Sequence, residues 1–420
     1  MAGPLEGLKV VDFSRVLAGP LCARTLQDLG AVVTKIEPPR ADVSRFASPV
    51  NANGVSGYYA QQNAGKRNLS IDLNRSEARE IALKLCDEAD ILVENFRPGA
   101  LEAFGLDYAT LAARNPRLIY VSISGYGQGG PWRGRMAYAP TVQAESGFTH
   151  HSLRHFGGNL AQPQTDALSH ADVYAGLQAV IGVLAALHQR QASGTGQYID
   201  VAMAATVMAI NERAHVDLNA LDLEDEPAIL GATDGSFFSG PNGERFVTAI
   251  SLVGTITFRF FMAAMRRADL ADDPRFATPG ARRANIDALR GIVQRWIWSF
   301  PNMAALDAQF DEAKIAIGEI RPLEDLARSE WADYWGATLQ VSDRNGGSFQ
   351  LPGRPWKFSG AELPAPGDPA LQGENNREVC RELGLVDDEI DRLEQQGALV
   401  GNFAARMIAM VLGQTNAAGT

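Results

Sequence analysis

Short apolar runs alternate with longer amphipathic segments through the first 125 residues of the chain. The runs are rich in β-branched residues and have the length of buried strands, at 8–13, 31–36, 68–73, 91–94 and 118–124. Helix-length segments separate them, and this alternation predicts βαβ units with a parallel sheet, an α/β fold. Because such crossovers are right-handed, the carboxyl ends of the strands should meet at one edge of the sheet, where ligands usually bind.

Residues that start and stop helices agree with this pattern. Pro20 suits the first turn of a helix that runs to about Leu29, and Gly30 suits its C-terminal cap. Asn74 is expected to cap a further helix over residues 76–86. These signals predict where the helices of the βαβ units begin and end.

The longest predicted helix covers residues 172–189. Its apolar side chains recur at spacings of three and four, at Val173, Leu177, Val180, Ile181, Leu184 and Leu187. The preceding stretch, 126–170, is rich in Gly, Pro and polar residues, so we expect it to be irregular and functional. A strand is predicted after the helix, at 198–201.

The pattern of hydrophobic and polar residues changes near Asp234, and we expect a boundary between two domains there. The predicted parts are a large Rossmann-like domain (1–215, completed by 350–420), a linker (216–234), a smaller α+β domain (235–325) and a second linker (326–349). Further helices are expected at 286–300, 374–383 and 387–411. A length of 420 residues is also more than one ordinary domain requires.

Composition narrows the class of protein. Hydrophobic residues make up 46% of the chain and charged residues 21%, which is typical of a globular protein. The net charge of −11 argues against a nucleic-acid partner, which requires a basic face, but a local basic pocket can still bind a small anion. The longest apolar stretch, 173–187, is too short to span a membrane and contains Gln178. We therefore expect neither a nucleic-acid partner nor a membrane.

Three cysteines, Cys22, Cys86 and Cys380, lie far apart, and no Cys/His cluster is present. This pattern predicts neither disulfides nor a metal site. The N-terminal residues lack a basic region followed by a long apolar run, so no signal peptide is expected. A reducing cytoplasm is the predicted location.

Several motifs occur in the same order as in a known family. They are KVVDFSRVLAGPLCARTLQDLGAVVTKIEPP (9–39), NAGKRNLSIDL (63–73), ADILVENFRPGALEAFGLDY (89–108), SGYGQGGP (124–131), ADVYAGLQAVIGVLAALHQRQASGTGQYIDVAM (171–203) and GENNREVCRELGL (373–385). In these motifs the chain resembles the class III coenzyme A transferases, the family that includes formyl-CoA transferase and carnitine CoA-transferase. The resemblance is loose over 205–350.

The resemblance implies an enzyme that moves CoA from an acyl-CoA donor to a carboxylic acid. It also implies a large Rossmann-like domain, a smaller domain and an interlocked homodimer. The CoA thioester would be a substrate, and no tightly bound cofactor is expected. A pocket between the domains would select the acid, and the sequence does not name that acid. Arg154 or Arg213 could pair with a second carboxylate, which suggests a dicarboxylic acid.

The family's nucleophile is the aspartate of a D-x-x-x-G motif, and here that motif places it at Asp172, with Gly176 four residues on. A carboxylate there would attack the thioester, form a mixed anhydride and then carry CoA as an aspartyl thioester. From its position alone, without the family resemblance, Asp172 is expected to be a helix N-cap. The start of a helix favours the ionised form of its carboxyl group. Glu145 and Asp166 are weaker candidates for a second polar group of the site.

Four segments resemble the family's CoA-contacting segments. Their candidate residues are Val16, Ala18 and Gly19 after the first strand, Arg40 and Arg45 after the second, Lys66 and Arg67, and Asn95, Phe96 and Arg97 after the strand at 91–94. Each isolated cation could equally be a solvated surface charge. Two positions depart from the family. Ala103 stands where many relatives have a basic residue, and Leu17 stands where formyl-CoA transferase has a polar one.

Two other functions are alternatives to CoA transfer. An α-methylacyl-CoA racemase shares these motifs but needs a His–Asp pair, expected near Tyr138 and Ala139. No histidine occurs between Gly125 and Phe148, and His150, His151 and His155 fall in another register. A non-catalytic CoA-binding protein would not need the intact motif at Asp172. Transfer is therefore the favoured function.

Overall fold

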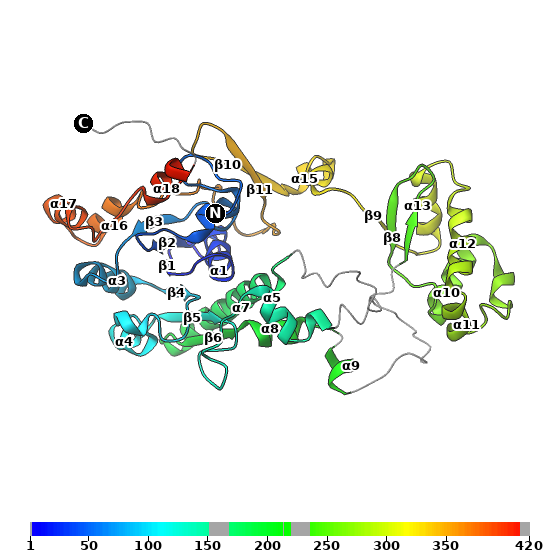
Figure 1. Cartoon of the computed structure of the whole chain (residues 1–420), viewed down its shortest axis with the longest axis horizontal. Helices are drawn as coiled ribbons and strands as arrows, with labels where there is room; N and C mark the ends of the chain where they lie inside the picture. Colours follow the sequence, from blue (N-terminus) through cyan, green and yellow to red (C-terminus); the bar gives the residue numbers. More distant parts are fainter. Residues whose placement is uncertain (1, 151–167, 213, 220–235, 412–420) are drawn as a thin grey trace. The chain divides into compact units, whose positions relative to one another are not determined.

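The computed structural model describes residues 2–150, 168–212, 214–219 and 236–411 of the chain. The chain divides into two compact units (Figure 1). The first comprises residues 1–212 and 333–420, and the second comprises 213–332.

The first unit is built on a six-stranded sheet in the order β3-β2-β1-β4-β5-β6. Its strands are β3 (Arg67–Ser70), β2 (Val32–Glu37), β1 (Lys9–Asp12), β4 (Ile91–Glu94), β5 (Ile119–Ser124) and β6 (Tyr198–Ala202). Every neighbouring pair is parallel, which confirms the predicted α/β fold. The strand order reverses between β1 and β4, so the carboxyl ends of these strands border a crevice suited to a ligand.

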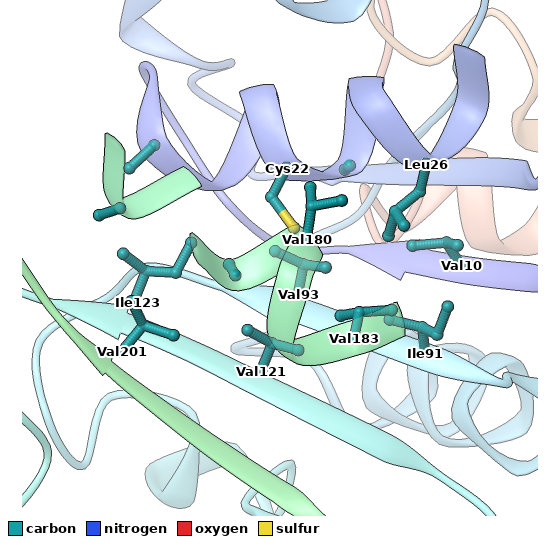
Figure 2. Packing of buried hydrophobic residues seen from close by; sticks show 14 of the residues in the cluster. Val10, Cys22, Leu26, Ile91, Val93, Val121, Ile123, Val180, Val183 and Val201 are labelled. Atoms are coloured by element: carbon teal, nitrogen blue, oxygen red, sulfur yellow. The ribbon is translucent and has the colours of Figure 1, made fainter. Parts of the chain in front are cut away.

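Helices cover both faces of the sheet, which explains why the strands are mostly buried and rich in apolar residues. On one face lie α1 (Ala18–Asp28) and α7 (His170–Ser193); on the other lie α3 (Ser76–Glu88), α4 (Tyr108–Arg114), α16 (Asn376–Glu382) and α17 (Asp387–Gln395). Figure 2 shows the first face, where Val10, Ile91, Val93 and Val121 of the sheet meet Cys22 and Leu26 of α1 and Val180 and Val183 of α7. Each such buried side chain contributes on the order of 1.5–3 kcal/mol.

Smaller elements complete the first unit. They are η1 (Val43–Phe46), α2 (Gly57–Asn63), η2 (Glu102–Phe104), α5 (Ala139–Glu145), α8 (Met203–Ile210), the hairpin of β10 (Thr338–Ser342) and β11 (Ser348–Pro352), and α18 (Phe403–Val411). The hairpin packs against Val55 and Tyr59. Residues 338–342, which the sequence placed in a linker, therefore form a strand of this unit.

The second unit contains a three-stranded antiparallel sheet, β7 (Phe237–Ser239), β8 (Arg245–Thr248) and β9 (Ile317–Glu319). Its helices are α9 (Ala214–Leu218), α10 (Thr255–Met265), η3 (Ala268–Ala271), α11 (Pro279–Ala284), α12 (Ile286–Ile297), α13 (Met303–Glu312) and α14 (Leu323–Ala327). A further helix, α15 (Glu330–Trp335), spans the boundary between the units. Phe246, Phe261 and Phe310 are buried together in the unit's own core.

The structure corrects some local predictions. Asn74 does not cap α3; the cap position is Arg75, and Asn74 donates its backbone and amide hydrogens to Asp72. The single helix predicted over 387–411 is two helices, because Gly397 adopts a left-handed conformation (φ 72°) and ends the first. The stretch expected to be irregular contains α5.

Candidate active site

Asp172 lies in the first turn of α7, which begins at His170 with Ser169 as its cap residue. The prediction that Asp172 itself opens the helix is therefore wrong by three positions. Its carboxylate accepts a hydrogen bond from the backbone N–H of Ala18, the first residue of α1. Two helix N-termini thus meet at this carboxylate.

Burial decides the proton affinity of Asp172. It raises the pKa of the carboxyl to about 6, although the Ala18 N–H acts in the opposite direction. The position at a helix end favours the ionised form, as predicted from the sequence, but the cost of removing the anion from water is larger. Near neutral pH, Asp172 is an ionised but poorly solvated carboxylate.

Gly176 explains the spacing of the D-x-x-x-G motif. A Cβ atom at Gly176 would lie 2.6 Å from the carbonyl oxygen of Ala18, closer than real contacts allow. The absence of a side chain lets α7 approach the start of α1 closely. Asp172, one turn earlier on the same helix, can then reach the Ala18 N–H.

We expect Gly176→Ala to displace the two helices, because the clash is with backbone and not with a mobile side chain. The unfolding free energy should fall by about 1–3 kcal/mol. Turnover should fall at least ~10-fold, since small misplacements of reacting groups are costly. Gly291→Ala in α12 is the control, because its Cβ would meet only the Arg295 side chain, at 3.5 Å. Equal stability and turnover in Gly176→Ala and wild type would refute this explanation.

The turn before α1 has a strained backbone, and hydrogen bonds with Asp42 and Asn95 hold it in place. Val16 has φ 67°, a left-handed conformation that β-branched residues rarely adopt. Its N–H donates to both carboxylate oxygens of Asp42, at 3.3 Å. Asn95 clamps the preceding residue: it accepts the Arg15 N–H and donates to the Arg15 carbonyl, both at 2.8 Å. The loop after β4 therefore fixes the turn after β1.

Buried ion pairs support this turn from inside the protein. They are Lys35–Asp42 (3.0 Å), Arg45–Glu37 (2.9 Å) and Lys66–Asp12 (2.8 Å). Lys66 also donates to the Pro20 carbonyl at 2.9 Å. Arg45 and Lys66 were candidates for CoA contacts, but their side chains are only 1% exposed. For these two residues the prediction is corrected: their charges are used within the protein.

A cavity of about 440 Å³ opens at the carboxyl ends of β1, β4 and β5. It is lined by the predicted residues Val16, Ala18, Asn95, Phe96, Arg97 and Asp172. Residues that sequence reasoning did not select also line it, among them Arg15, Tyr58, Arg133, Arg135 and Tyr138. Among the described residues that line it, Asp172 is the one carboxylate, and four are arginines. The cavity is therefore suited to an anionic ligand.

Tyr58 lies close enough to Asp172 to feel its charge. Burial, followed by the negative charges of Asp172 and Asp42, raises the pKa of the Tyr58 hydroxyl. The hydroxyl therefore stays protonated and is a hydrogen-bond donor in the cavity wall. The sequence offered no signal for this residue, because an isolated tyrosine in a helix is usually a packing residue.

The remaining predicted residues lie elsewhere. Arg67 is at the amino end of β3, away from the cavity, and donates to Glu382 and Thr34. Arg40 is exposed and Gly19 is buried beside Ser14, and neither lines the cavity. Glu145 accepts the Tyr126 hydroxyl and pairs with Arg135. Asp166, Arg154, Arg213, His151 and His155 are outside the described residues.

A second, apolar cavity of about 160 Å³ adjoins the first at Arg15 and Phe96. Pro38, Pro39 and Ile71 are among its lining residues. The Arg15 guanidinium lies 4.7 Å from the centre of the Phe96 ring, between the two spaces. The combination is a charged cavity beside a smaller, mainly apolar slot.

Metal chemistry has no candidate centre in the described part of the chain. No group of three or more His, Cys, Asp or Glu side chains there is arranged to hold a metal ion. The three cysteines are buried and unpaired.

A doubly wound parallel sheet with a buried carboxylate and arginines at its switch point defines an enzyme for an anionic, nucleotide-like ligand. Comparison with known families makes this specific. The model of CoA-transferase family III matches residues 5–376, and the chain belongs to this family.

Individual relatives agree with this membership. The formyl-CoA:oxalate CoA-transferase of Streptomyces avermitilis is 30% identical over 95% of this chain and 100% of its own length. The succinyl-CoA:mesaconate CoA-transferase of Haloarcula marismortui is 31% identical over 93% of this chain and 99% of its own. The crystal structure of a CaiB/BaiF family protein from Brucella suis has a TM-score of 0.74 and 30% identity, covering 91% of this chain and 100% of that one. The protein is a family III CoA-transferase, and these names do not favour the racemase alternative.

Proposed function

We propose that Asp172 is the nucleophile that carries the acyl group and then CoA between two carboxylic acids. The observation that supports this proposal most directly is the position of its carboxylate. It lies in the wall of the cavity at the sheet's switch point, and no other carboxylate lines that cavity in the part of the chain that the structure describes. The remaining steps follow from the chemistry of thioesters and anhydrides.

In the first step an oxygen of Asp172 attacks the thioester carbonyl carbon of the acyl-CoA. The C–S bond breaks, CoA leaves as a thiolate, and a mixed anhydride remains. The thiolate then attacks the aspartyl carbonyl and the donor acid leaves as a carboxylate, so that CoA is bound to Asp172 as a thioester. The acceptor carboxylate attacks the aspartyl carbonyl of this thioester and displaces the CoA thiolate, so that a second mixed anhydride forms. The thiolate then attacks the acceptor carbonyl of this anhydride, which releases the new acyl-CoA and the Asp172 carboxylate. Each step exchanges one activated acyl bond for another, so no further energy source is needed.

The surroundings of Asp172 suit this role. A carboxylate with a pKa of about 6 is ionised at neutral pH and is less shielded by water than an exposed one. The Ala18 N–H holds one of its oxygens in place. Tyr58 and the arginines of the wall supply donors for the negative charge that develops on the attacked carbonyl.

The two adjoining cavities suggest how CoA binds. The cavity of about 440 Å³ would hold the pantetheine arm, with its sulfur near Asp172, against Val16, Ala18, Asn95 and Phe96. The apolar slot of about 160 Å³ would hold the adenine, because an aromatic base fits an apolar space. Gly19 would act indirectly, by allowing the close turn before α1. Arg40 follows the two prolines of the slot and remains a proposed contact at its rim.

For the acceptor we propose a dicarboxylic acid larger than oxalate. Relatives are named for oxalate and for mesaconate, both of which carry two carboxylates. The excess of arginines in the cavity can pair with a second carboxylate. Leu17, an apolar residue, also lines the cavity, which favours a longer carbon chain. An acceptor panel from oxalate to mesaconate, with thioester products identified by mass spectrometry, tests this choice.

Hydroxylamine should inactivate the enzyme only when an acyl-CoA is present, because it attacks the activated aspartyl carbonyl. Peptide mass spectrometry should then find a hydroxamate on Asp172. Asp172→Asn is the control and should acquire no label and show no transfer. Label on a different residue, or normal transfer by Asp172→Asn, would exclude Asp172 as the nucleophile.

We also propose that two copies of the chain associate, as the family resemblance implies. One face of α7 is apolar but 37–57% exposed, at Tyr174, Leu177, Ile181 and Leu184. Among the described helices α7 is the one long and apolar enough to cross a membrane, yet its other face is packed against α1 and the sheet. A second copy would cover the exposed face. Light scattering that gave the mass of one chain, 45.2 kDa, would contradict this. The cytoplasm remains the proposed location and is supported by the free cysteines.

A further inference from the structure

Glu94, the last residue of β4, is a buried acid that the proposed mechanism does not use. It is 5% exposed. Three other buried carboxylates at this edge of the sheet, Asp12, Glu37 and Asp42, each have a lysine or arginine partner at 2.8–3.0 Å. Within the described residues, no ion pair includes Glu94. A buried carboxyl without a cation is costly when ionised, so packing alone does not explain an acid at this position.

The Glu94 carboxylate binds the start of the loop that follows β4. Its Oε2 atom accepts the backbone N–H of Phe96 at 2.8 Å. It also accepts the hydroxyl of Ser122, a residue of β5 that is 2% exposed. One hydrogen bond therefore ties the loop to the strand it leaves, and the other ties that strand's last residue to the neighbouring strand.

This loop in turn holds the walls of the cavity that contains Asp172. Asn95 accepts the Arg15 N–H and donates to the Arg15 carbonyl, and the strained residue Val16 follows directly. The Phe96 ring lies under the Arg15 guanidinium and lines both the Asp172 cavity and the apolar slot. A displacement of the Phe96 N–H would therefore move both walls.

Glu94 changes its protonation near neutral pH. Burial raises the pKa of its carboxyl to about 7; the two hydrogen bonds oppose this rise, and the negative charge of Asp200 on β6 adds to it. Glu94 lines a third cavity, of about 300 Å³. The other titratable or charged side chains around it are Tyr120 of β5, Tyr198 of β6 and, from the rest of the cavity wall, Arg97, Glu102, Asp107, Tyr108 and Arg133.

We propose that Glu94 is a positioning residue, whose ionised carboxylate fixes the loop after β4, and with it the turn before α1, in the arrangement that binds CoA. It acts through the backbone of Phe96 and the side chain of Asn95, not by contact with the ligand. A glutamine could accept the same two hydrogen bonds without a buried charge, but a charged acceptor makes them about twice as strong. This inference rests on the proposed function, since it assumes that CoA occupies the Asp172 cavity.

Glu94→Gln tests the role of the charge, with the dissociation constant of CoA measured by calorimetry on the full chain. At pH 8 the variant should bind CoA about 5-fold more weakly than wild type, because its hydrogen bonds are no longer charge-assisted. At pH 6, where Glu94 of the wild type is mostly protonated, the two proteins should agree within about 2-fold. A phosphate of CoA also titrates near pH 6, but it does so equally for both proteins.

The stability of the same variant should change in the opposite direction. The native pKa of about 7 lies above the ordinary 4.5, so wild-type stability falls between these values and the full cost applies above them. Glu94→Gln removes this cost, and its midpoint of denaturant unfolding should be higher than that of wild type at pH 8. A merely structural residue would lower stability and affinity together.

Two further variants complete the test. Glu102→Gln removes the same charge from the same cavity, but Glu102 is exposed, so CoA affinity should stay within about 2-fold of wild type at every pH. Ser122→Ala removes one donor from the Glu94 carboxylate and should raise its pKa. The difference in CoA affinity between Ser122→Ala and its double variant with Glu94→Gln should then appear at a higher pH than the difference between wild type and Glu94→Gln.

Three results would overturn the positioning role. They are wild-type CoA affinity of Glu94→Gln at pH 8, an equal loss at pH 6 and pH 8, and an equal loss in Glu102→Gln. Turnover at saturating acyl-CoA should stay within about 3-fold of wild type in Glu94→Gln, because the residue acts on binding and not on the reacting atoms. A loss of turnover without a loss of affinity would also contradict the role.

Failure of the proposed function has a different signature. If hydroxylamine does not label Asp172 in the wild type while CoA affinity still follows the charge of Glu94, the nucleophile is wrong and the positioning role stands. If Asp172 is labelled and Glu94→Gln binds CoA as wild type does at pH 8, the positioning role is wrong and the transfer mechanism stands.

Discussion

Asp172→Asn should abolish CoA transfer and, at pH 8, make the folded protein more stable. The activity should fall at least ~1,000-fold, because a neutral amide cannot attack the thioester. The stability should rise because burial raises the pKa of the native carboxyl from the ordinary 3.8 to about 6. A carboxylate kept away from water therefore costs folding free energy whenever it is ionised.

The sign of the pH effect follows from proton binding. Since the native pKa is above the ordinary value, the folded state holds the proton more tightly, and stability falls as pH rises from 3.8 to about 6. Above that range the full cost applies, at most about 3 kcal/mol for a shift of this size and less once partial exposure is allowed for. Asn has no such cost. The stabilisation of Asp172→Asn should thus be about 1–3 kcal/mol at pH 8 and shrink toward zero near pH 4.

Denaturant unfolding at several pH values measures the stability part. The wild-type transfer rate should rise with pH through about 6 as Asp172 ionises. Asp287→Asn is the matched control, because Asp287 also lies in the first turn of a helix, α12, but is exposed. It should change stability by no more than about 0.5 kcal/mol. A less stable Asp172→Asn at pH 8 would show that the carboxylate is not under this strain.

Arg45→Met should lower the free energy of unfolding by about 3–5 kcal/mol at neutral pH, because it leaves a buried charge without its partner. Arg45 pairs with Glu37 at 2.9 Å and donates to the Tyr59 hydroxyl and to the carbonyl of Ala370. Removing it leaves the buried Glu37 carboxylate without its cation, although Tyr59 and Asn68 still donate hydrogen bonds to it, and leaves the Ala370 carbonyl without this donor. Arg40→Met, in the same segment but exposed, should stay within about 0.5 kcal/mol of wild type.

The pH dependence of this loss has the opposite sign from that of Asp172. Burial alone would raise the pKa of Glu37, but the Arg45 guanidinium holds it below the ordinary 4.5. A lowered native pKa contributes stability above pH 4.5, and this contribution is lost as pH falls through the native pKa. The gap between wild type and Arg45→Met should therefore be widest at neutral pH and narrow in acid.

A second variant separates a structural role from a role in binding. Glu37→Leu combined with Arg45→Met should recover part of the stability, because the unpaired charge is then gone. If Arg45 contacted CoA directly, single and double variants would lose CoA affinity without a comparable loss of stability. Calorimetry with CoA and chemical unfolding of the same samples distinguish these outcomes.

Local pattern was sufficient for much of the fold. Apolar runs at 91–94 and 118–124 coincide with β4 and β5, and helical spacing from Val173 to Leu187 falls within α7. These signals predict the elements correctly because the periods of strands and helices depend on residues that are close together in the sequence. The order of the motifs was also sufficient to identify the family, whose model matches residues 5–376. It also placed Asp172 and Gly176 on one helix, where the structure has them.

Contacts between distant segments decided the rest. The partner of Arg45 at Ala370 is 325 residues away, so no local pattern could show whether Arg45 faces a ligand or the interior. The same holds for Arg133, which lines the Asp172 cavity together with Arg97 although the two residues belong to different segments of the chain. The raised pKa of Asp172 comes from the packing of α7 against α1. Burial and charge depend on the whole fold, and they determine which of several plausible polar residues can do chemistry.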